Sequence, residues 1–201
     1  MSEKIAQIYV FNAQKDIIEK EIKNRIMTKS TFMNGFEKTV NALESVFGKQ
    51  PDIDLNSPSL QKGLSILCDA IDEVDEYVIT ENGNDCVIAS EWFDYGGIVN
   101  QAEDLLSDKE YDFLAVGTDG WDVFVAALYE SGKISAKLVV GSYEDLHIKA
   151  HNSNLHIFDD KFNAPSGAFK ALIKEKSIEK ARRKFEQLTN LNFDLFDWDE
   201  E

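Results

Sequence analysis

Acidic side chains dominate one short part of the chain. The residues from Asp69 to Asp85, DAIDEVDEYVITENGND, include seven acids and no base. A calcium loop needs oxygen ligands at alternating positions and a glycine at its sharp turn, but Ile71 and Val74 stand where ligands would be needed. We therefore expect no bound metal in this stretch, and no motif elsewhere in the chain points to a cofactor.

Two interpretations of the acidic stretch remain: a solvated helix face, which charge runs usually form, and a docking surface for a basic protein. Ser57 and Pro58 predict a helix start, and apolar residues follow at helical spacing. Four carboxylates fall on the opposite side of this helix, namely Asp69, Asp72, Glu73 and Glu76. They lie at its C-terminal end, where the helix dipole disfavours each anion by roughly a few tenths of a kcal/mol. This cost favours the docking interpretation.

The charge of the chain is concentrated in its middle. The net charge is −16, and residues 52–130 hold nineteen acids against only Lys62 and Lys109. Charge of one sign in one region raises the local potential and speeds encounter with an oppositely charged partner. Nucleic acid and anionic membranes are poor partners for such a surface, so we expect neither to bind directly.

Aromatic residues beside acids supply candidate apolar anchors for docking. The sequence predicts a binding surface that includes Trp92, Phe93, Asp94 and Tyr95 of EWFDYGG, and Asp119, Trp121 and Asp122 of the turn TDGWD. Trp and Tyr are enriched among the residues that dominate interface energies. The stretch 193–201, FDLFDWDEE, suits either docking in an apolar groove with a basic rim or folding back on the protein's own core. We expect the fold-back, since exposed aromatic patches are rare.

Other candidate chemistry is weaker. His147, His151 and His156 lie close in sequence, but no further ligand stands at a convincing zinc spacing. The triplet at 159–161, Asp-Asp-Lys, matches part of a nuclease carboxylate–lysine centre, and such short matches often arise by chance. No nucleophile elbow and no phosphate-binding loop occurs in the chain. We therefore predict no catalytic residue, although the abundance of acids leaves a metal-dependent enzyme with an acidic cleft as an alternative.

Hydrophobic periodicity predicts an α+β fold with a mainly antiparallel sheet packed against helices. A short helix is expected over 98–106 with Ile98, Ala102 and Leu105 facing inward. A C-terminal helix is expected over roughly 164–188, in one piece or broken near Ser177. Further helices are expected in the first fifty residues and over 57–76.

Strands are predicted from alternation and turn residues. A type I′ turn at Asn82-Gly83 would join two strands, and two-residue turns at Asp119-Gly120 and Ser131-Gly132 would join three more in a meander. Those turns would place Val116 opposite Val123, Val125 opposite Leu138, and Glu130 opposite Lys133. The segment 154–158 is expected as a short strand, and 4–11 as a strand or the start of a helix.

The domain organisation predicted is a helical N-terminal part, residues 1–50, packed on an acidic α+β domain, residues 51–201, with the whole forming one compact unit. The stretch Lys49–Asn56 resembles a linker. No secretory signal and no apolar run long enough to span a bilayer occurs. Cys68 and Cys86 are expected to be buried thiols in a reducing compartment. These features predict a cytoplasmic protein of undetermined oligomeric state.

In size, charge and lack of catalytic motifs, the chain resembles the small acidic immunity proteins of the bacterial cytoplasm, which block a basic toxin by covering its active site. No residue motif carries this class-level resemblance, so it assigns no residue a role. It implies a non-catalytic inhibitor of a basic protein, plausibly a nuclease-type toxin, acting by electrostatic and steric occlusion. A DNA mimic that inhibits a DNA-binding protein is a further alternative.

Overall fold

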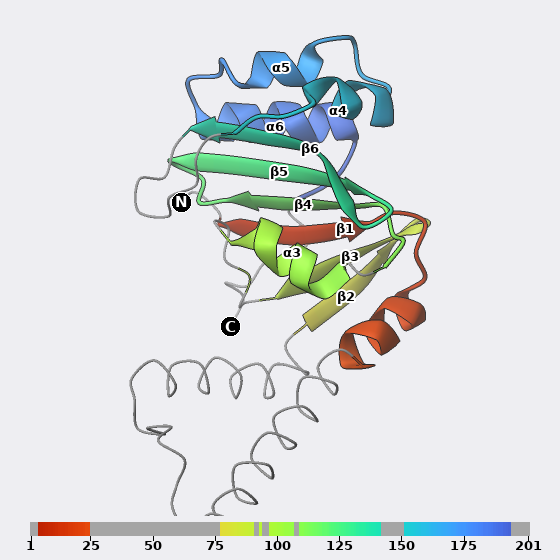
Figure 1. Cartoon of the computed structure of the whole chain (residues 1–201). Helices are drawn as coiled ribbons and strands as arrows, with labels where there is room; N and C mark the ends of the chain where they lie inside the picture. Colours follow the sequence, from red (N-terminus) through yellow and green to blue (C-terminus); the bar gives the residue numbers. More distant parts are fainter. Residues whose placement is uncertain are drawn as a thin grey trace, which may run out of the picture. The chain divides into compact units, whose positions relative to one another are not determined.

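A six-stranded sheet forms the centre of the structure, a computed structural model that describes residues 4–24, 77–90, 93, 97–106, 109–141 and 151–193. The strand order is β2-β3-β1-β4-β5-β6 (Figure 1). The strands are β1 (Ile5–Val10), β2 (Tyr77–Asn82), β3 (Asp85–Ser90), β4 (Phe113–Thr118), β5 (Val123–Glu130) and β6 (Lys133–Gly141). Neighbouring strands run antiparallel, which confirms the predicted α+β class.

The chain divides into two compact units, one of Met1–Lys15 with Val78–Glu201 and one of Asp16–Tyr77. The first contains most of the sheet, because residues 5–10 pair with β3 on one side and β4 on the other. In the second, residues 16–24 are helical, and Ile18 and Ile22 are buried. The rest of the helical structure predicted in the first fifty residues and the helix predicted over 57–76 lie outside the described residues.

Helices cover both faces of the sheet (Figure 1). On one face lie α4 (Leu155–Lys161), α5 (Ala168–Leu172) and α6 (Ile178–Thr189); α3 (Ile98–Leu106) lies on the other. Strands β4 and β5 are buried along almost their whole length, because both of their faces are covered. Of the two alternatives for the C-terminal helical stretch, the structure has the one broken near Ser177: α5 ends at Leu172, and the Ser177 hydroxyl accepts the Lys180 N–H and caps α6.

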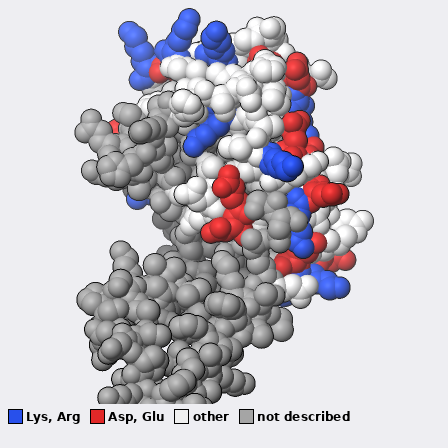
Figure 2. All heavy atoms as spheres, in the orientation of Figure 1, with Lys and Arg blue, Asp and Glu red and all other residues white. Residues whose placement is uncertain are grey.

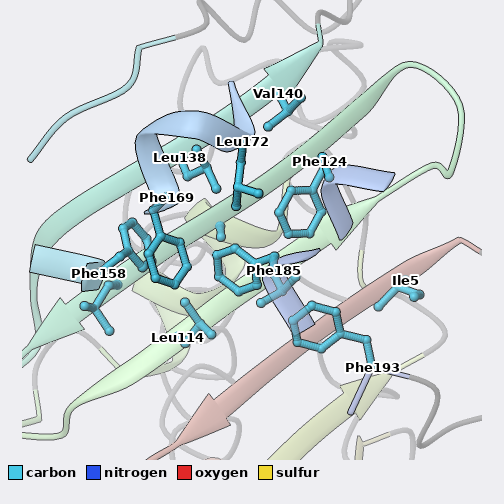
Figure 3. Close-up of a cluster of buried hydrophobic side chains, with 14 of the residues drawn as sticks. Ile5, Leu114, Phe124, Leu138, Val140, Phe158, Phe169, Leu172, Phe185 and Phe193 are labelled. Carbon is cyan, nitrogen blue, oxygen red and sulfur yellow. The ribbon is translucent and has the colours of Figure 1, made fainter. Parts of the chain in front are cut away.

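An aromatic cluster joins the three helices to the sheet (Figure 3). The Phe185 ring of α6 lies at its centre, with ring centroids 5.1 Å from Phe124, 5.2 Å from Phe169 and 5.9 Å from Phe158. Phe193 closes the cluster, 5.9 Å from Phe185. The fold-back of the stretch after α6 is therefore confirmed at Phe193, whereas Phe196 and Trp198 lie outside the described residues.

Three local predictions need correction. The segment 154–158 starts helix α4 instead of a strand, because only one isolated bridge, from Lys137 to Ser153, extends the sheet there. The first hairpin turns at Gly83-Asn84, one residue later than predicted, with φ +66° at Gly83. In α3, Leu106 and not Leu105 is buried with Ile98 and Ala102.

The register of the meander differs from that predicted at two places. The Ser131-Gly132 turn is confirmed, with positive φ at both residues and Glu130 opposite Lys133. A bulge at Ser135 then shifts the pairing by one residue, so Val125 lies opposite Val139 instead of Leu138. The shift turns Leu138 towards the helices α4–α6, where it joins the core. The second difference lies in the β4–β5 connection, which forms the candidate site.

Tyr129 fastens α3 to the sheet. Its ring stacks on Phe113 with centroids 4.2 Å apart, and its hydroxyl lies 3.0 Å from a carboxylate oxygen of Glu103 and 3.3 Å from the Val99 carbonyl. Burial raises the pKa of Tyr129, and the nearby Glu103 charge and hydrogen bond raise it further. The proton of Tyr129 is therefore held more tightly in the folded state than in the unfolded state.

We expect Tyr129→Phe to lower the free energy of unfolding by about 1–3 kcal/mol at neutral pH, because a hydrogen bond to a carboxylate is lost. The folded-state pKa of Tyr129 is raised, so its contribution is complete below the unfolded pKa near 10 and is lost as pH rises towards the folded value. Urea denaturation between pH 7 and pH 11 should therefore show a variant less stable than wild type at pH 7, with the difference shrinking at alkaline pH. A constant difference across this range would contradict the assignment.

Candidate functional site at one end of the sheet

The connection between β4 and β5 presents the most exposed large apolar side chain among the described residues. Residues 119–122 form this connection, and Thr118 pairs with Phe124. The predicted two-residue turn at Asp119-Gly120 is therefore wrong, and so is the pairing of Val116 with Val123. The connection is longer because the side chain of Asp119 folds the backbone into a wider loop.

The buried carboxylate of Asp119 stabilises the loop by accepting backbone hydrogen bonds. One carboxylate oxygen of this buried residue accepts the N–H groups of Trp121 and Asp122 at 2.9 Å and of Val123 at 3.0 Å. Asp side chains commonly organise turns by accepting N–H groups two or more residues ahead. Asp119 is one of the predicted contact residues, and in the structure its carboxylate supports the loop that carries Trp121.

Thr118 adds a second set of bonds at the base of the loop. Its hydroxyl oxygen accepts the Gly120 N–H at 2.9 Å and donates its proton to the Val123 carbonyl at 2.8 Å. Gly120 takes φ +78°, a conformation that costs other residues energy. Four consecutive backbone N–H groups, from Gly120 to Val123, are thus bound by two side chains, and this fixes the loop.

The end of β6 supports the loop from the side. Gly141 pairs with Val123 and takes φ +81°. A Cβ atom at Gly141 would lie 2.0 Å from the Asp122 carbonyl oxygen and 2.8 Å from a methyl carbon of Ile178. Only glycine allows this close approach of β6, the loop and the start of α6. Neither Thr118 nor Gly141 could be predicted as a support, since nothing local in the sequence marks either residue.

Trp121 stands out from this fixed loop with 72% of its surface exposed. Asp122, beside it, is also exposed, and its carboxylate has no partner within the part of the chain that the structure describes. A large aromatic on a rigid backbone makes a strong binding anchor, because little further order is lost on association. Trp121 and Asp122 are therefore the two predicted site residues that the structure presents for contact.

The other predicted aromatics follow β3. Strands β3 and β4 both run antiparallel to β1, so Ser90 and Thr118 end at the same end of the sheet. One strand lies between β3 and β4, which places these ends roughly 10 Å apart. Phe93 is half-buried, with its N–H donating to the Ser90 carbonyl at 3.1 Å. Trp92, Asp94 and Tyr95 lie outside the described residues, as do Asp69, Asp72, Glu73 and Glu76.

Acids at the opposite end of the sheet have structural partners. Asp85 accepts the Asn12 N–H at 2.9 Å, and Asp112 accepts the Ser131 N–H at 3.0 Å and the Lys161 ammonium at 2.6 Å. Burial acts to raise the pKa of Asp112, but the hydrogen bonds from Lys161 and Ser131 outweigh it and lower the pKa below its ordinary value. Asp122 differs from these acids, because its carboxylate has no partner among the described residues.

The acid excess is distributed unevenly over the structure. The described residues hold fifteen Lys or Arg and seventeen Asp or Glu, so the other six bases and twenty acids lie outside them. Within the described part, residues 151–193 hold eight bases and five acids. Figure 2 shows this contrast, with Lys and Arg over the α5 side of the molecule and acids over the α3 side.

The weaker candidates for catalytic or metal-binding chemistry are Asp159 and the histidines, and the structure shows a different environment for each. Asp159 is buried and accepts the N–H groups of Gly167 and Phe169, so it organises the start of α5. His151 and His156 are exposed. Among the described residues, no three His, Cys, Asp or Glu side chains form a group that could hold a metal ion. Cys86 is buried, as predicted, and its thiol lies 3.0 Å from the Ala13 carbonyl oxygen.

Comparisons of the chain with protein-family models, with curated proteins and with solved structures find no match in any of the three. In the described part of the chain, no helix combines the length and the apolar character that a membrane span requires.

Proposed function

We propose that this protein is a non-catalytic binding protein that neutralises a basic protein by electrostatic and steric occlusion, in the manner of a bacterial immunity protein acting on a nuclease-type toxin in the cytoplasm. The observation that carries the proposal is Trp121, which is 72% exposed on a loop fixed by Asp119 and Thr118. A few residues, often Trp, Tyr or Arg, contribute most of the binding energy of a protein interface, and Trp121 is suited to be one of them. The net charge of −16 favours a cationic partner.

In this proposal Trp121 enters an apolar recess of the partner, and Asp122 meets a Lys or Arg beside it. Trp92, Phe93, Asp94 and Tyr95 add contacts from the chain that follows β3. Asp69, Asp72, Glu73 and Glu76 belong to the other compact unit and form a second set of contacts. Carboxylates placed where a nuclease binds phosphate would exclude its substrate. Association should be fast and should weaken as salt rises.

The experiment is affinity capture with the full chain as bait, followed by calorimetric binding of the captured protein. We expect a basic partner whose activity is blocked at one equivalent, and we expect Trp121→Ala to weaken binding by at least about 30-fold, since hot-spot residues contribute about 2 kcal/mol or more. Ile134→Ala is the matched control: Ile134 is 46% exposed but lies on β6 at the opposite end of the sheet, so binding should not change.

Several results would reject the proposal. Equal affinities for the Trp121 and Ile134 variants would remove the proposed anchor, and a neutral or acidic partner would remove the electrostatic argument. A captured DNA-binding protein that DNA displaces would support the DNA-mimic alternative. Turnover of a small substrate with added divalent metal would favour the enzyme.

A further inference from the structure

Helices α5 and α6 form a basic face that is independent of the Trp121 site. Exposed lysines and one arginine cover it; they are Lys170, Lys174, Lys176, Lys180, Arg183 and Lys184. Arg183 pairs with Glu179 at 2.5 Å, and Lys184 pairs with Glu175. The other four side chains pair with no acid among the described residues. The face is thus cationic within a chain of net charge −16.

A hollow opens between the two helices on this face. Its volume is about 240 Å³, and its lining combines apolar side chains with polar ones that include Lys184: Ala168, Ala171, Leu172, Glu175, Lys184, Gln187 and Leu188. This volume is below the roughly 300 Å³ at which small-molecule sites begin. The hollow therefore suits a large side chain better than a whole cofactor.

The chemistry of a suitable occupant follows from these two features. It must carry several negative charges and at least one large apolar side chain. Residues 194–201 of this chain, DLFDWDEE, hold five acids, no base, and the side chains of Leu195, Phe196 and Trp198. The acids of this segment are opposite in charge to the basic face, and its apolar side chains match the apolar part of the hollow's lining.

The position of Phe193 brings this segment within reach. The Phe193 ring packs against Phe185 of α6 (Figure 3). The Tyr9 hydroxyl lies 2.5 Å from the Asn192 carbonyl. The hollow lies against the same helix, on its α5 side. An α-helix is about 10–12 Å across, and three to five extended residues span roughly 10–17 Å. Phe196 and Trp198 stand three and five residues beyond Phe193, so the segment can cross α6.

We propose that residues 194–201 dock in cis on the α5–α6 basic face, with an aromatic side chain in the hollow and the carboxylates among the unpaired lysines. A tether of a few residues gives an effective concentration in the mM range, so even weak docking is well populated. Docking would place the acids of 194–201 over the basic face and neutralise its positive charge. The surface on this side of the protein would then be acidic. This inference does not depend on the proposed function.

The test is zero-length carbodiimide cross-linking of the full chain at low protein concentration, with the linked peptides mapped by mass spectrometry. We expect links from Lys170, Lys174, Lys176 or Lys180 to acids of 194–201 within the monomer. The double variant Phe196→Ala/Trp198→Ala should lower their yield about tenfold while leaving all reacting groups in place. Trp121→Ala removes a tryptophan elsewhere and is the matched control, for which the yield should not change.

Three outcomes would overturn the proposal. The yield of these links could be the same in the double variant as in wild type, which would leave the hollow without a role. The links could occur only in a covalent dimer, which would assign the segment to a second copy. The acids of 194–201 could link only to lysines that do not belong to the basic face, while the double variant and the wild type show equal thermal midpoints.

Discussion

Replacing Gly141 by alanine is expected to lower the free energy of unfolding by about 2–5 kcal/mol. Two costs add at this position. Alanine at φ +81° costs about 1–2 kcal/mol by itself. The new Cβ would also lie 2.0 Å from the Asp122 carbonyl oxygen, which is backbone and cannot rotate away, so β6 and the loop must separate. Overpacking of this kind adds about 1–3 kcal/mol.

Gly167→Ala provides a matched control, because Gly167 has the same φ of +81° and nothing lies within 4 Å of the added Cβ. Gly167→Ala should lower the free energy of unfolding only by the conformational cost of placing alanine at this φ. Urea denaturation of both variants then isolates the clash as the difference between them. Amide hydrogen exchange at Trp121, Asp122 and Val123 should become faster in Gly141→Ala alone, since their bonds to Asp119 depend on the position of the loop. Equal stability losses in the two variants would show that the loop does not press on Gly141.

The second large effect is expected for Phe185→Ala, with a loss of about 3–5 kcal/mol in the free energy of unfolding. Phe185 is fully buried, and its ring contacts Phe124 of the sheet, Phe158 of α4 and Phe169 of α5. Phe158 and Phe169 also stack on each other, with centroids 5.2 Å apart, so neither ring is free to fill the space that the Phe185 ring leaves. The loss is a large fraction of the roughly 5–15 kcal/mol that stabilises a typical domain.

Phe162→Ala is the control for Phe185→Ala. Phe162 is half-buried at the edge of the same cluster, with rings of Phe11 and Phe169 about 6 Å away. Its removal leaves a space that water can enter, so we expect less than half the effect. Denaturant midpoints for the two variants and wild type make the comparison. Similar losses for both variants would mean that the cluster has no centre and that α4–α6 pack loosely on the sheet.

Elements governed by neighbouring residues could be predicted from the sequence. The Ser131-Gly132 turn, the limits of α3 and the break before α6 all follow from turn residues, helical spacing or a capping hydroxyl, which act within a few positions. The interactions that form them involve the same short stretch of chain in any fold. The antiparallel class follows in turn, because short turns join adjacent strands in that arrangement.

Elements governed by distant contacts could not be predicted. The Ser135 bulge turns Leu138 towards helices that come later in the chain, and the helix α4 replaces a strand where the sheet offers it no neighbour. The central position of β1 depends on pairing with β3 and β4, which lie more than seventy residues away. These arrangements depend on contacts in the core between residues that are far apart in the chain. A local sequence pattern does not encode such contacts.

The sequence by itself determined the negative charge of the protein and the identity of its candidate anchors, since both depend only on which residues are present. The tertiary structure alone decided their roles. It buried Asp119 under three backbone N–H groups and left Trp121 and Asp122 in solvent, although all three lie within four positions. The physical reason is that a carboxylate can leave water only where donors replace its hydration, and the folded loop supplies those donors at Asp119 and not at Asp122.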